Sequence, residues 1–152
     1  MLTFLKLLHL FGIVVWVGGM FFAYMVLRPT AASVLQPPER LRLWNGVFSR
    51  FFNWVWLAIC AILLSGLYLI YLYGGMAHVG HYVHTMLLLG LVMVGIYVYV
   101  FFGCFVPFSL HVEKERWKEA AAMLNKIRQL VAINLSLGLI TLAVATLGVQ
   151  FG

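Results

Sequence analysis

Charged side chains are scarce in this sequence: they make up 9% of its 152 residues, whereas 64% are hydrophobic. A soluble domain averages about 25% charged residues, so the composition excludes a water-soluble protein. Acidic residues are the scarcest, with four in total. None of them lies in a predicted membrane span, which argues against a proton relay built on carboxylates. We predict an integral membrane protein that forms a single transmembrane domain over residues 1–152.

Several sequence motifs of known chemistry are missing. The two cysteines, Cys60 and Cys104, match no zinc or haem-attachment spacing. Phosphate loops, Ser-His-Asp order and nucleotide fingerprints are also lacking, so nothing indicates a hydrolase or a kinase. The formal net charge of +6 comes mostly from two short connections. Membrane orientation explains it better than binding to nucleic acid.

Long apolar runs dominate the chain. Each is long enough to cross a hydrocarbon core about 30 Å thick as a helix, and the short connections favour antiparallel neighbours. We therefore predict an all-α fold, an up-down-up-down four-helix bundle in the lipid bilayer. The predicted spans are residues 3–27, 51–73, 81–106 and 129–149.

The connections add two predictions. Pro37, Pro38 and Glu39 are typical of a helix start. We therefore predict a short cytoplasmic interfacial helix between spans one and two, from Pro38 to about Arg50, that runs into the second span. Nine of the ten Lys and Arg lie in or beside connections one and three. The positive-inside rule places both connections in the cytoplasm, and the second connection and both termini on the extracytoplasmic side.

Two histidines occupy matching positions in spans one and three. His9 shares a helical stripe with Gly12 and Trp16, and small residues on such a stripe let another helix or a flat ligand come close. His84 lies near the start of span three, at a depth that agrees with that of His9 to within about one turn. A titratable side chain inside a span is a functional-site hypothesis by default.

We predict that His9 and His84 bind one cofactor near the extracytoplasmic face. In the haem b interpretation, His9 and His84 are the two axial ligands. Gly12 leaves room for the edge of the porphyrin, and Trp16 flanks the ring. Lys6 pairs with a propionate group of the haem. In the copper interpretation, thioether and imidazole ligands suit the metal. The further candidate copper ligands are His81, His78, Met86 and Met76.

Several stretches of the chain point to a known family. They are Leu8-His9-Leu10, residues 16–29, 35–40 and 50–56, and Val83-His84-Thr85-Met86. They resemble the small stand-alone members of the CopD (copper resistance D) family. The resemblance implies a bacterial-type cytoplasmic (inner) membrane protein with four spans, and it carries over His9 and His84 as candidate functional positions. The family name implies copper handling.

A second, more distant similarity is to the HemJ-type haem membrane proteins. That group has a lysine in the third span, in a His-Val-Lys-like motif, where this chain has His84-Thr85-Met86. The difference argues against porphyrinogen oxidation and leaves haem binding open.

Three functions stay open at this point. The first is a haem b protein that transfers electrons to a redox partner. The second is copper binding or transport, and the third is a non-catalytic subunit of a larger membrane complex. A homo-oligomer is compatible with each of them.

Overall fold

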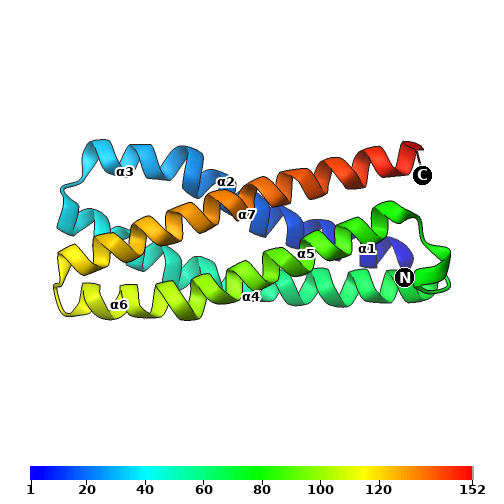
Figure 1. Cartoon of the computed structure of the whole chain (residues 1–152), viewed down its shortest axis with the longest axis horizontal. Helices are drawn as coiled ribbons and strands as arrows, with labels where there is room; N and C mark the ends of the chain where they lie inside the picture. Colours follow the sequence, from blue (N-terminus) through cyan, green and yellow to red (C-terminus); the bar gives the residue numbers. More distant parts are fainter. Residues whose placement is uncertain (152) are drawn as a thin grey trace.

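Four long helices make up the protein. The computed structural model describes the backbone of residues 1–151 and the side chains of residues 1–150. Within this part of the chain, four helices are long and apolar enough to cross a membrane, and Figure 1 shows that they run antiparallel to their chain neighbours. The predicted all-α membrane bundle is confirmed. The four helices cover Leu2–Val34, Pro37–Leu72, His81–Glu113 and Trp117–Gln150.

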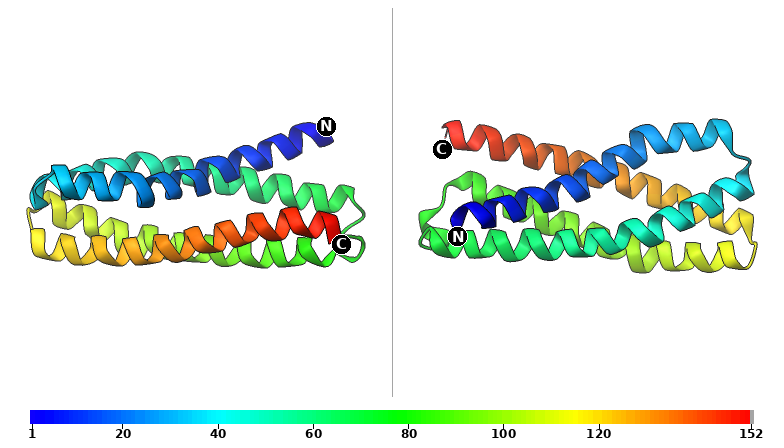
Figure 2. Two further views of the ribbon diagram at one scale, coloured as in Figure 1. Left: turned by 90° about the horizontal axis from the view of Figure 1, so that it is seen from above. Right: turned by 180° about the vertical axis from the view of Figure 1, so that it is seen from behind.

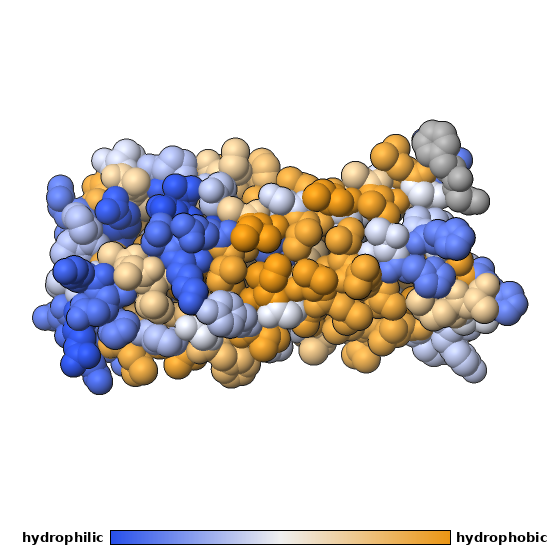
Figure 3. Space-filling view, in the orientation of Figure 1, coloured by the Kyte–Doolittle hydropathy of each residue, from blue (hydrophilic) through white to orange (hydrophobic). Residues whose placement is uncertain are grey.

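The surface has the pattern of a membrane protein. Figure 3 shows a broad apolar belt between two more polar ends, and many large apolar side chains, such as Leu64 and Phe102, are exposed. In water these side chains would be unfavourable, but in a bilayer they face lipid. The chain is therefore a multi-pass membrane protein in contact with the bilayer.

The first and third helices are built from several segments. The first comprises α1 (Leu2–Ile13), η1 (Val14–Gly18), α2 (Gly19–Phe22), η2 (Ala23–Leu27) and α3 (Arg28–Val34). The third comprises α5 (His81–Tyr99), η4 (Val100–Phe105) and α6 (Val106–Glu113), and it follows a short 3₁₀ turn, η3 (Met76–His78). The second and fourth helices are α4 (Pro37–Leu72) and α7 (Trp117–Phe151).

The π-helical segments η2 and η4 each end two residues before a proline, Pro29 and Pro107. Proline lacks the backbone N–H and its ring collides with the carbonyl four residues earlier. Widening the preceding turn relieves that collision, so the sequence explains why the regular helix is interrupted at these two places.

The predicted helix between spans one and two is present in the structure. Pro38 to Arg50 is helical and forms the first part of α4, which continues without a break into span two and ends at Leu72. Its apolar face is buried: Leu41, Trp44 and Phe48 pack into the core of the bundle. The segment is therefore continuous with span two, and its apolar side chains contact protein. Its position at the membrane surface stays a prediction.

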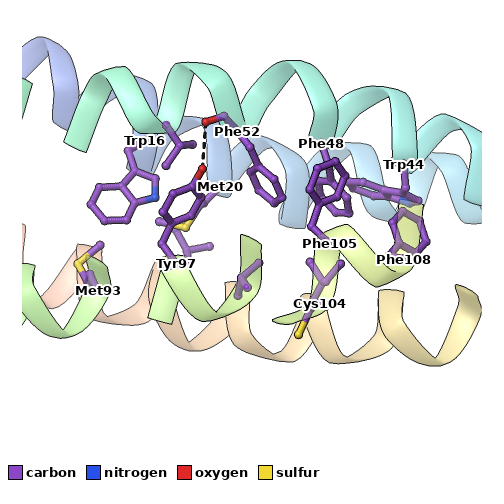
Figure 4. Close-up of a cluster of buried hydrophobic side chains, with 14 of the residues drawn as sticks. Trp16, Met20, Trp44, Phe48, Phe52, Met93, Tyr97, Cys104, Phe105 and Phe108 are labelled. Carbon is purple, nitrogen blue, oxygen red and sulfur yellow. Dashed lines mark hydrogen bonds between the residues drawn. The ribbon is translucent and has the colours of Figure 1, made fainter. Parts of the chain in front are cut away.

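The core is a column of aromatic rings between the helices (Figure 4). Phe48 and Phe52 of α4 stack with ring centroids 5.1 Å apart. The Tyr97 hydroxyl of α5 donates a hydrogen bond to the Phe52 carbonyl at 3.0 Å, and Trp16 meets Tyr97 edge to face. This column fixes the rotation of the helices about their axes.

The helices pack mainly as two pairs. α1 lies along α4, and α5 lies along α7. Figure 2 shows that α1 and α7 diverge toward the two chain termini, which lie at the same end of the bundle as the connection between α4 and α5 (Figure 1). We call this end, which carries His9, His78, His81 and His84, the histidine end.

Candidate functional site

His9 is anchored to α4 through one ring nitrogen. Its Nδ1 lies 3.1 Å from the Ile62 carbonyl oxygen and 3.0 Å from Ser65 Oγ. A carbonyl only accepts hydrogen bonds, so Nδ1 carries the proton. The Ser65 hydroxyl donates to the Ala61 carbonyl, which leaves its oxygen free to accept the same N–H. In the neutral imidazole, Nε2 is then the unprotonated nitrogen.

The sequence of α4 makes this close approach possible. A Cβ placed on Gly66 would lie only 3.0 Å from His9 Cε1. Ser65 is 1% exposed, so its hydroxyl is satisfied inside the protein and adds a second contact for the histidine. Ser65 and Gly66 therefore provide a small, polar contact surface for an imidazole within an apolar span.

His78 and His84 show the same arrangement. Nδ1 of His78 lies 2.8 Å from the Gly74 carbonyl oxygen, and Nδ1 of His84 lies 3.3 Å from the Gly80 carbonyl oxygen. In both neutral rings Nδ1 is thus the donor and Nε2 has a free lone pair. Metal-bound histidines usually donate their other ring N–H in this way, which fixes the ring and leaves one nitrogen for the metal.

His81 and His84 lie side by side on the first turn of α5. Their ring centroids are 6.2 Å apart, as expected for residues three apart on a helix. Both side chains are exposed, so rotation about their side-chain bonds can direct both rings at one ion. Met76 and His78 lie on the neighbouring η3 turn and are also exposed.

The turn that presents these residues depends on two glycines. Gly74 and Gly75 have φ angles of 93° and 89°, a conformation that side-chain-bearing residues rarely adopt. They reverse the chain after α4, and η3 and the start of α5 follow them in the sequence. The second connection has no Lys, Arg, Asp or Glu, so imidazole and thioether groups are its metal-binding side chains.

The structure does not bring all the predicted site residues together. His9 belongs to the α1–α4 pair and His84 to α5, and within residues 1–150 no hydrogen bond or ring contact joins them. The open side of Gly12 is filled by Ile62 of α4. Trp16 is 4% exposed and belongs to the core, whereas Lys6 is exposed. Met86 is half-buried on α5.

The described residues also hold no group of three or more His, Cys, Asp or Glu side chains close enough to bind a metal ion. The histidine end also offers the thioether sulfurs of Met76 and Met86 besides its imidazoles. The contacts that anchor His9 were not singled out as a site from the sequence. The only sequence signal for them is a serine beside a glycine in an otherwise apolar span.

Comparison with known proteins gives a family match. A family model described as copper resistance protein D matches residues 45–147. The match covers the second connection and the helices on both sides of it, and it includes His78, His81 and His84. A search of the curated proteins and a search of the solved structures each gave no match. The distant similarity to HemJ-type proteins stays a prediction.

Proposed function

Because the chain belongs to the copper resistance protein D family, we propose that it binds copper as its cargo at the histidine end. The observation that carries this proposal is the adjacent pair His81 and His84, with ring centroids 6.2 Å apart on one exposed helix turn. Imidazole and thioether are the ligands that suit copper. Met76 and His78 on the adjoining turn supply the remaining donors.

His9 provides a candidate ligand for copper farther inside the membrane-spanning part of the bundle. Its ring contacts Ser65 and Gly66 of α4, which lie about 10 Å inside the end of that helix at a rise of 1.5 Å per residue. Its free Nε2 is a nitrogen donor deeper in the bundle than the His81–His84 pair. We infer that His9 is a second contact point for copper after the outer histidines.

We also propose that the histidine end faces the extracytoplasmic side of a bacterial cytoplasmic membrane. Nine of the ten Lys and Arg lie toward the opposite end, in α3, in the first part of α4, in the turn before α7 and in the first part of α7, and positive residues favour the cytoplasm. A phosphatase reporter fused after Gly152, which works only outside the cytoplasm, should therefore be active. A cytoplasmic reporter that is active at the same position would contradict this orientation.

Electron transfer through haem b is a second candidate. One observation favours it: His9 and His84 both present a free Nε2 while Nδ1 contacts a carbonyl, as axial ligands do. When bound, haem would supply one-electron chemistry. The nitrogen donors fit this role. The two rings belong to different helix pairs, however, and the space beside Gly12 is filled by Ile62, so copper remains the main proposal.

An absorption spectrum of the purified full chain, oxidised and then reduced, combined with metal analysis, separates the candidates. Copper binding predicts a protein without haem bands that retains copper. Haem binding predicts split bands of six-coordinate haem, which His9→Ala or His84→Ala would remove and His81→Ala would not. A protein without metal or pigment that co-purifies with a fixed partner would favour a subunit of a larger complex and contradict both.

A further inference from the structure

A large cavity lies at the end opposite to the histidines. It has a volume of about 610 Å³ and is lined by η2, α3, the first turns of α4 and the first half of α7. Figure 1 and the right view of Figure 2 show α3 standing apart from α4 and α7 at this end. We call this space the arginine cavity.

Three of the six arginines line it: Arg28, Arg40 and Arg128. No Asp or Glu is among its described lining residues. In the part of the chain that the structure describes, one ion pair joins Arg42 to Glu115. Neither of these two residues lines the cavity. No carboxylate therefore lines the cavity beside the three guanidinium groups, and none of them belongs to the Arg42–Glu115 ion pair.

The contacts of these arginines are neutral. Arg28 lies over the Tyr24 ring, with its Cζ 4.9 Å from the ring centroid. Arg128 donates a hydrogen bond to Asn125 Oδ1. A guanidinium has five N–H donors, so most donors of each group remain available to a ligand. Arginine matches phosphate and carboxylate oxygens especially well.

The rest of the lining is apolar. Leu41, Trp44, Phe48 and Ile127 are almost completely buried and border the same cavity. Along α4 the order is Arg40, then Trp44, then Phe48, so the lining changes from charged to apolar toward the membrane centre. Such a lining fits a ligand that has an anionic head and an apolar tail.

The position of the cavity matches the headgroup layer of the membrane. Arg28 directly follows the apolar run of the first helix, and Arg128 comes just before that of α7. Basic residues at such boundaries lie at the level of the lipid headgroups. Figure 3 shows the polar surface at this end next to the apolar belt.

We propose that the arginine cavity binds one anionic phospholipid, with the phosphodiester held by Arg28, Arg40 and Arg128 and an acyl chain against Trp44 and Phe48. Three uncompensated positive charges exclude copper as the ligand of this cavity. The site is thus separate from the proposed copper site and is independent of it.

Native mass spectrometry of the detergent-solubilised full chain tests this proposal. We expect wild type to retain one phosphatidylglycerol per chain in preference to phosphatidylcholine. The variant Arg28→Gln/Arg40→Gln/Arg128→Gln should bind phosphatidylglycerol about 100-fold more weakly. Each arginine contributes about fivefold to the affinity, and the three factors multiply. The matched control Arg42→Gln/Arg50→Gln/Arg116→Gln loses the same charge outside the cavity and should bind like wild type.

Two results would overturn the proposal. The first is equal phosphatidylglycerol affinity in the two triple variants, which would mean that net charge alone attracts the lipid. The second is competition by glycerol phosphate at the same concentration as the lipid, which would assign the cavity to a small soluble phosphate. The single variant Arg40→Gln, with its helix content checked by circular dichroism, provides the same comparison if the triple variant does not fold.

Discussion

Replacing His81 and His84 together with alanine should lower the copper(I) affinity of the purified protein by at least about 100-fold. The two rings are adjacent on one exposed turn of α5, and each supplies a nitrogen that the shorter side chain cannot replace. Loss of groups that merely orient a ligand already costs 10–100-fold in metal affinity, so loss of two ligands costs at least as much. Competition with a chromophoric copper(I) chelator measures the change.

The matched control for this experiment is His111→Ala. His111 lies on α6 at the opposite end of the bundle, so its removal should leave copper binding unchanged. Met76→Leu tests the donor set, because it keeps the volume of the side chain and removes the sulfur; a measurable weakening is expected. Wild-type affinity in His81→Ala/His84→Ala would show that copper binds elsewhere.

Replacing Gly12 with leucine should destabilise the protein by about 1–3 kcal/mol or more. A Cβ at this position would lie 2.7 Å from Ile62 Cγ1 and 3.0 Å from the Ala58 carbonyl oxygen of α4. The backbone oxygen cannot move aside cheaply, so α1 has to shift away from α4. The shift would also pull His9 from Ser65, which couples the packing of the first helix to the proposed inner copper contact.

Gly18→Leu is the control for this substitution on the same helix. Nothing lies within 4 Å of a Cβ at Gly18, and the residue is exposed, so the stability should change by no more than about 0.5 kcal/mol. Reversible unfolding in mixed detergent micelles compares the two variants. Equal stabilities would mean that the close contact between α1 and α4 contributes little to the fold.

The membrane architecture could be predicted because it depends on local composition. Apolar runs of about 20 residues have few alternatives to spanning helices, and each predicted span lies in one of the observed helices to within a residue. The packing of the helix before span two was less predictable. The apolar face of residues 41–48 fits lipid and protein equally well, and only the position of α6 and α7 decides that it packs into the core.

The candidate site was predictable only in part for a similar reason. The stripe of small residues on the first helix indicated a close neighbour, either a helix or a flat ligand. The structure shows α4 beside Gly12, a result that depends on which helices pair and how they rotate. The arginine cavity could not be predicted from the sequence. Arg28 and Arg128 are 100 positions apart, and no local sequence pattern indicates that they lie close together.

The central claim, that copper binds at the histidine end, is tested most directly by X-ray absorption at the copper edge on the full chain loaded with copper(I). The account predicts scattering from imidazole nitrogens together with sulfur, and loss of the imidazole contribution in His78→Ala/His81→Ala/His84→Ala. An unchanged spectrum in that variant, or a wild-type protein that retains no copper after removal of the excess, would contradict it.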